Sequence, residues 1–110
     1  RVTSVTEPQT EIWTACQVGG DDANRAYNES VSLRLTGSLD RAALARAWQS
    51  LLRHHEALRS AFSGNGTQML IFRTIEAPLA YIDAAGNGAQ PADVAANYIA
   101  ADAHHLFDLA

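Results

Sequence analysis

A long amphipathic helix is the feature that most constrains the fold of this chain. Asp40 is a good N-cap, because its carboxylate can accept a hydrogen bond from a free backbone N–H of the first turn. Helical spacing then places on one face Leu44, Ala47, Trp48, Leu51, Leu52 and His55. The opposite face carries Arg41, Ala45, Gln49 and Arg53. The pattern predicts a helix within residues 38–58.

Two further elements are predicted before this helix. Residues 4–20 form a first helix, with Thr6 as N-cap, Pro8 tolerated near the start, and glycines at 19 and 20 ending it. Its apolar face holds Ile12, Ala15 and Cys16, and a polar loop follows. Residues 27–36 alternate as a half-buried strand does. One face of that strand carries Tyr27, Glu29, Val31, Leu33 and Leu35.

The second half of the chain predicts a hairpin, a strand and a helix. Residues 59–72 form the hairpin, because Gly64, Asn65 and Gly66 accept the positive φ of a tight turn. Residues 77–83 are a short strand and residues 84–91 a loop. A last helix runs from about Pro91 to His105, with its inward face made of Val94, Tyr98 and Ile99. This order predicts an α/β (α+β) sandwich.

Composition excludes several function classes. The chain has 110 residues, 47% of them apolar, which is enough for one domain to bury its own core. All eight basic residues are arginines, set against twelve carboxylates, so the net charge of −4 argues against a nucleic-acid partner. No apolar run approaches the length of a membrane span. The single Cys16 cannot form an internal disulfide, which suits the cytoplasm.

Two histidine pairs and the cysteine are the obvious candidates for chemistry. His54 and His55 point about a hundred degrees apart on a helix, so they do not converge on one metal ion, and we expect His55 to be a packed core residue. His104 and His105 favour the negative end of the last helix. Cys16 is expected to be inert packing. We therefore assign no metal site.

Arg59 is the more informative residue. It follows the long helix where a strand should begin, close to the core, and a guanidinium there requires a carboxylate or several carbonyl partners. The candidates within the chain are Glu56, Asp83 and Asp108. If none of them fits, the partner is expected beyond Ala110.

Several segments together resemble the condensation domains of nonribosomal peptide synthetases. In TEPQTEIWTA, Thr6, Gln9 and Trp13 match that family's first motif, S/T-x-A-Q-x-R-L/M-W/Y-x-L, although Pro8 and Glu11 depart from it. HHEALRSAF is similar to the second motif, R-H-E-x-L-R-T-x-F, with five matches: His55, Glu56, Leu58, Arg59 and Phe62. GSLDRAAL and the closing FDLA lie where the family has G-x-L-D-x-x-A-L and F-D-L-x-x-G-P-L, so the likeness spans the chain.

The resemblance implies a fold and a function. Such domains have two lobes like chloramphenicol acetyltransferase, and this chain corresponds to part of the N-terminal lobe, residues 1–110. Donor and acceptor carrier proteins deliver substrates on phosphopantetheine arms, no cofactor is bound directly, and an amide bond forms. The catalytic motif is H-H-x-x-x-D-G, whose second histidine assists the attacking amine. By resemblance, Arg59 supports the active site by pairing with the aspartate of that motif.

Neither histidine pair of this chain fits the catalytic motif. Residues 59–60 and 109–110 are Arg-Ser and Leu-Ala where Asp-Gly is required, so we expect no catalytic residue within the chain and place the motif downstream of Ala110. The chain is thus expected to be an inactive piece of a bacterial synthetase and to need the remainder of its domain. AYNESVSLRL resembles domains that act after polyketide modules, which implies a polyketide–peptide hybrid. Such a piece should expose apolar edges, for example residues 68–72.

Two other interpretations remain open from the sequence. One is a condensation-like module that binds or recruits partners without chemistry, and the other is a self-sufficient small α/β domain. The residues do not reveal which monomers are joined, the donor stereochemistry, or whether the parent condenses, epimerises or cyclises.

Overall fold

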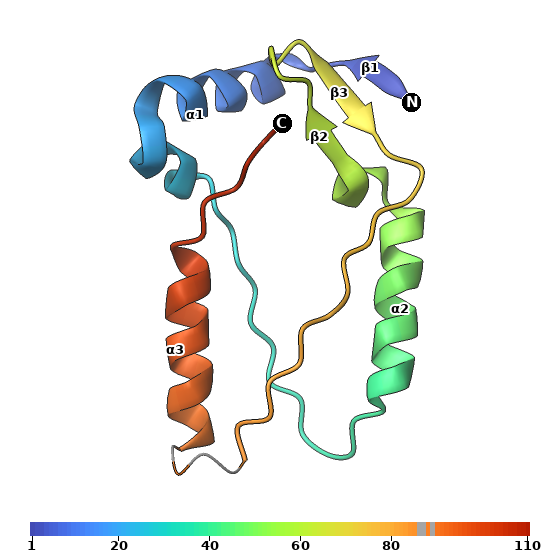
Figure 1. Ribbon diagram of the computed structural model, residues 1–110, viewed down its shortest axis with the longest axis vertical. Coiled ribbons are helices and arrows are strands. Elements are labelled where there is room, and N and C mark those ends of the chain that lie inside the picture. Colours follow the sequence, from blue (N-terminus) through green and yellow to red (C-terminus); the bar gives the residue numbers. More distant parts are fainter. Residues whose placement is uncertain (86–87, 89) are drawn as a thin grey trace.

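The fold is a mixture of helices and a small sheet. The computed structural model describes residues 1–85, 88 and 90–110. In chain order the elements are β1 (Val2–Ser4), α1 (Glu7–Ala26), α2 (Arg41–His54), a 3₁₀ turn η1 (Glu56–Arg59), β2 (Ser60–Phe62), β3 (Gln68–Ile71) and α3 (Pro91–Ala103), as labelled in Figure 1. The prediction of a mixed helix and sheet class is confirmed.

The sheet has three antiparallel strands in the order β1-β3-β2. The predicted hairpin is β2 and β3, and its turn is closed by a 2.8 Å hydrogen bond from the Gly66 N–H to the carbonyl of Ser63. β1 was not predicted, because three residues are too few for an alternating pattern to be recognised. β1 covers the outer edge of β3, so the expectation that residues 68–72 form an open edge is wrong.

The helices begin where their capping residues predict. Gln9 accepts a 2.8 Å hydrogen bond from the Thr6 N–H before α1, and Asp40 accepts one of 2.9 Å from the Ala43 N–H at the start of α2. Gly20 interrupts α1 with φ of 63° and ψ of −153°, which a glycine adopts without strain. A second helical piece then continues to Ala26 where a loop was predicted. An ion pair of 2.7 Å between Arg25 and Asp22 supports this piece.

Residues 27–36 and 77–83 contain no strand, so both strand predictions are wrong. Tyr27 lies in the turn that caps α1. A strand needs a backbone partner for its N–H and C=O groups, and neither segment pairs with the sheet within the described residues. The apolar side chains of residues 27–36 are consequently exposed: Val31 is 87% and Leu33 81% accessible. Both segments cross the molecule as single chains between the helices (Figure 1).

Side chains of α2 hold the second of these segments, residues 77–83. The Trp48 Nε1–H donates a 2.6 Å hydrogen bond to the carbonyl of Ala77, and the guanidinium of Arg41 lies 3.3 Å from the ring centroid of Tyr81. The contacts fix residues 73–83 along α2 without a strand partner.

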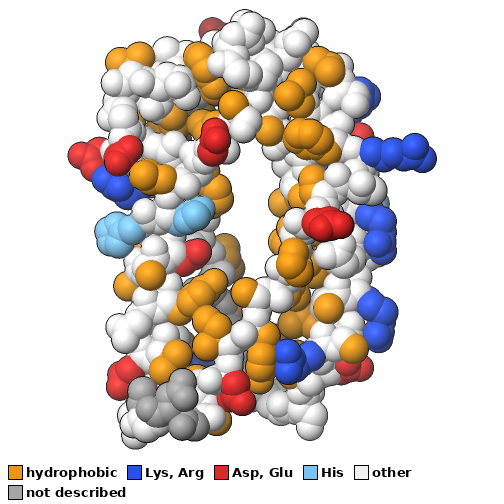
Figure 2. Space-filling view, viewed as in Figure 1, with side chains coloured by type: hydrophobic (Ala, Val, Ile, Leu, Met, Phe, Trp, Pro, Cys, Tyr) orange, Lys and Arg blue, Asp and Glu red, His pale blue; other side chains and the backbone are white. Residues whose placement is uncertain are grey.

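The molecule is open, and the expected sandwich with its own core does not form in the described residues. Its radius of gyration is 17.1 Å, whereas a compact domain of this length has about 13 Å. Among the described residues, the buried apolar side chains are Cys16 at 8% and Leu52 at 4% accessibility. Figure 2 shows an opening through the molecule, bordered by apolar side chains. The predicted inward face of α3 lines an open pocket together with Ala80 and Ile82. Tyr98 and Ile99 on that face remain about half exposed.

No helix in the described part of the chain is long and apolar enough to cross a membrane. The predicted loop at residues 84–91 is described only in part, because residues 86, 87 and 89 lie outside the described residues.

Candidate functional site

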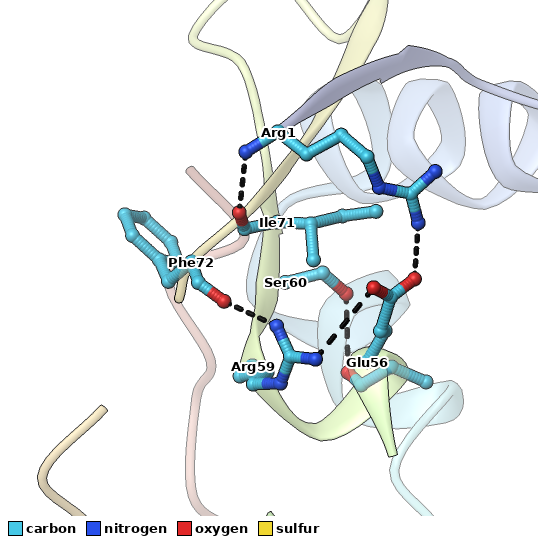
Figure 3. Close-up of polar contacts among 7 residues, drawn as sticks. Arg1, Glu56, Arg59, Ser60, Ile71 and Phe72 are labelled. Atoms are coloured by element: carbon cyan, nitrogen blue, oxygen red, sulfur yellow. Dashed lines mark hydrogen bonds and ion pairs between the residues drawn. The ribbon is translucent and has the colours of Figure 1, made fainter. Parts of the chain in front are cut away.

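Arg59 is held at the junction of α2, β2 and the end of β3. The 3₁₀ turn η1 brings the chain from α2 into β2, as the sequence predicted for the end of a helix followed by a strand. The side chain of Arg59 is only 13% exposed. One terminal N–H of its guanidinium donates to the carbonyl of Phe72, the residue that follows β3 (Figure 3).

Glu56 is the carboxylate that the structure places beside Arg59, but the pair is loose. The distance from Arg59 Nη2 to Glu56 Oε1 is 3.6 Å, which is too long for a hydrogen bond. Glu56 is half-exposed and is engaged more closely by the guanidinium of Arg1 (Figure 3). Glu56 therefore neutralises Arg59 only in part.

The other two predicted partners lie elsewhere. The carboxylate of Asp83 accepts a 2.9 Å hydrogen bond from the Ala85 N–H, and that of Asp108 accepts one of 3.2 Å from the Ala110 N–H. Both contacts are local turns. Asp83 and Asp108 form no ion pair with Arg59 in the described part of the chain.

The surroundings of Arg59 are positively charged, and its guanidinium is not fully hydrogen-bonded. Arg53, Arg59 and Arg73 line the same small pocket. The Nε–H of Arg59 is buried and has no hydrogen-bond partner among the described residues. A buried guanidinium with a free donor is costly, and an incoming carboxylate satisfies it best because two parallel N–H groups can bind its two oxygens. The guanidinium of Arg59 is therefore only partly satisfied by the described residues.

Backbone contacts with the N-terminal strand fix the position of this site. The backbone nitrogen of Arg1 donates a 2.9 Å hydrogen bond to the Ile71 carbonyl, and the Ile71 N–H donates one of 2.7 Å to the Arg1 carbonyl. The Ser60 hydroxyl donates to the carbonyl of Ala57 at 3.1 Å, which closes the turn before β2. Sequence reasoning missed Arg1 and Phe72, because neither a backbone carbonyl nor a long-range ion pair leaves a pattern in the sequence.

Trp13 connects the first helix to the hairpin. Its indole packs over Gly66, where an added Cβ would overlap the ring. Gly66 has φ of 69°, so the turn and the close approach both require glycine there. The TEPQTEIWTA segment therefore reaches the turn of the hairpin whose first strand, β2, belongs to the HHEALRSAF segment.

The histidines and the cysteine form no common site in the described structure. His55 is exposed and follows α2 as its C-terminal cap, so the expectation of a packed core residue is wrong. Its ring meets that of His54 edge to face at 4.8 Å. His104 caps α3, which ends at Ala103. Cys16 is a buried free thiol, as predicted. The described residues contain no cluster of three potential metal ligands.

Comparisons with known proteins agree with the resemblance found in the sequence. The family model described as "Condensation domain" matches residues 1–110. Surfactin synthase subunit 1 of Bacillus subtilis (strain 168) is 37% identical over 82 residues, or 73% of this chain. Chondramide synthase cmdD of Chondromyces crocatus is 41% identical over 61 residues, or 56% of this chain. Bacitracin synthase 2 of Bacillus licheniformis is 36% identical over 42 residues, or 38% of this chain.

The matched segment is only a small part of each relative. In each case the match spans 2% of the relative's length. No solved structure matches this chain at a significant level.

Proposed function

This chain belongs to the condensation-domain family, and on that premise we propose that it is the N-terminal part of an amide-forming domain in a nonribosomal peptide synthetase. The complete domain joins an acyl or peptidyl donor to an aminoacyl acceptor. Both substrates arrive on the phosphopantetheine arms of carrier proteins in the cytoplasm. The chain itself supplies scaffold and one supporting residue, Arg59.

The incomplete neutralisation of Arg59 is the observation that carries this proposal. Its guanidinium is mostly buried, retains a free Nε–H among the described residues, and has Glu56 only at 3.6 Å. The resemblance supplies the missing anion, namely the aspartate of an H-H-x-x-x-D-G motif beyond Ala110. A bidentate ion pair between them would fix the loop that carries the catalytic histidine.

The chemistry of the complete site is consistent with this arrangement. The second histidine of the motif assists the acceptor amine as it attacks the donor thioester, by taking its proton or by orienting it. The C–N bond forms, the C–S bond breaks, and the donor's thiol arm leaves. No step falls to a residue of this chain, so the 110 residues alone are expected to form no amide.

Reading the parent coding sequence past Ala110 tests the proposal. An intact H-H-x-x-x-D-G after FDLA is the expected result. A stop codon, or a motif without its second histidine, would contradict amide formation and would leave the recruitment module as the function of this fold.

A further inference from the structure

Two asparagine side chains hold the backbone near the end of the chain. The Asn24 Nδ2–H donates a 2.9 Å hydrogen bond to the carbonyl of Phe107, and Asn24 Oδ1 accepts one of 3.3 Å from the Phe107 N–H. The Asn28 Nδ2–H donates a 2.7 Å hydrogen bond to the carbonyl of His105. The partners are 83 and 77 residues apart in sequence, so these are tertiary contacts.

A primary amide is well suited to this role. The side chain of asparagine presents N–H donors beside a carbonyl acceptor, so it can pair with both polar groups of one residue as a neighbouring strand would. A carboxylate of the same shape only accepts, and the oxygen that replaces the Asn24 Nδ2 would face the Phe107 carbonyl with negative charge. The double contact of Asn24 thus fixes the register of residues 105–107 and not only their position.

The held segment enters the sheet immediately afterwards. The carbonyl of Leu109 accepts a 2.8 Å hydrogen bond from the Phe62 N–H in β2. Since β3 occupies one edge of β2, Leu109 lies at the other edge. Figure 1 shows this segment leaving α3, passing α1 and ending beside β2. Arg59 is the last residue of η1 and immediately precedes β2.

We propose that Asn24 and Asn28 are positioning residues that fix where residues 105–109 join the free edge of β2, the strand that begins directly after Arg59. We call the hydrogen bonds from the side chains of Asn24 and Asn28 to residues 105–107 the clamp. The helical piece after Gly20 supports it, because this piece carries Asn24 and ends just before Asn28. The importance of Arg59 beside this strand rests on the proposed function. The clamp itself rests only on the hydrogen bonds of Asn24, Asn28 and Leu109.

Hydrogen exchange of the intact polypeptide that carries this chain tests the clamp, read in peptides covering residues 60–63 and 105–110. At pH 8, Asn24→Ala and Asn24→Asp should both accelerate exchange of the Phe62 and Phe107 amides by about tenfold, because these amides lose their acceptors or the alignment to them. Exchange in β1 and β3 should not change. Unaltered exchange at residues 60–63 in both variants would overturn the proposal.

Acidification distinguishes a hydrogen-bonded clamp from a packing role. A protonated carboxyl at position 24 regains a donor and an acceptor in the shape of the native amide. Because this carboxyl faces a carbonyl oxygen, its pKa lies above the ordinary value of about 4. The clamp is therefore present below that pKa and is lost as the pH rises. Protection should therefore return in Asn24→Asp toward pH of about 4.5, after correction for intrinsic exchange rates. It should not return in Asn24→Ala, and equal behaviour of the two variants would overturn the proposal.

Nearby titratable groups require the wild type as a control over the same pH range. The charged residues and histidines that neighbour the clamp in sequence are Asp21, Asp22, Arg25, Glu29, His104, His105 and Asp108. If the Asn24 variants unfold, which faster exchange in β3 would report, Asn28→Ala carries the test because it removes one hydrogen bond. Amide formation by the same polypeptide is measured separately. If the variants lose protection but even the wild type forms no amide, the proposed function alone is contradicted. If protection is unchanged in a polypeptide that does form the amide, the clamp alone is contradicted.

Discussion

Gly66 shows how a single residue ties two segments of this fold together. It lies beneath the indole of Trp13 with φ of 69°, so Gly66→Ala adds both backbone strain and a steric overlap. We expect a loss of about 2 kcal/mol or more in the free energy of unfolding, measured by urea denaturation.

Gly64 provides the matched control in the same turn. An added Cβ there meets nothing within 4 Å among the described residues, and its φ is not among the positive values. Gly64→Ala should change the free energy of unfolding by no more than about 0.5 kcal/mol. Equal effects at the two glycines would contradict the packing of Trp13 on this turn.

The two tryptophans differ in one hydrogen bond. Trp48 Nε1–H donates to the Ala77 carbonyl, whereas the Nε1–H of Trp13 has no partner among the described residues. Trp48→Phe should therefore cost about 1 kcal/mol more than Trp13→Phe, since only the former removes a hydrogen bond while both shrink a ring. Circular dichroism during urea unfolding measures both variants. A larger loss from Trp13→Phe would contradict the assignment of the Ala77 contact.

At the scale of elements, the helix starts differ in the quality of their caps. Asp40 accepts from the Ala43 N–H, but Gln90 makes no side-chain capping hydrogen bond in the described structure. We predict that Gln90→Asp stabilises the chain by about 0.5–1 kcal/mol and that Asp40→Ala destabilises it by about 1 kcal/mol. Helical circular dichroism and thermal unfolding check both changes. Destabilisation by Gln90→Asp would show that the start of α3 is bound by other contacts.

The elements also show what sequence patterns can and cannot predict. The helices and the hairpin were predictable because caps, turn glycines and helical spacing are local signals, as at Asp40 and Gly66. The alternating pattern of residues 27–36 is as clear a local signal as those of the helices and the hairpin. A strand, however, also needs a neighbouring strand to pair with. That partner is a non-local requirement, and within the described residues it is missing. The same limit applies to the site: Arg59 could be singled out, but its contact with the Phe72 carbonyl could not.

At the scale of the whole molecule, the exposed alternating segment predicts self-association. Val31 and Leu33 are almost fully exposed on an extended chain with open backbone groups, a combination that promotes pairing with other chains. We expect the 110-residue chain to sediment as oligomers at high concentration in analytical ultracentrifugation. Val31→Lys together with Leu33→Lys should restore the monomer, whereas Ser32→Lys on the other face should not. A clean monomer of the unmodified chain would refute this prediction.

The same open architecture suits a part of a larger domain better than a self-sufficient one. Only Cys16 and Leu52 are buried apolar side chains in the described residues, which is little core for this length. The family match over residues 1–110 agrees with this interpretation.

Amide formation by the complete condensation domain is the most direct test of this account. Donor and acceptor carrier proteins are loaded, and the amide product is quantified by mass spectrometry for the wild type, Arg59→Ala and Glu56→Gln. We predict product from the wild type and a small change in Glu56→Gln. Arg59→Ala should lose about 100-fold or more, because the proposed ion pair with the aspartate of the catalytic motif is removed. A wild type without product, or an Arg59→Ala variant as active as the wild type, would contradict this account.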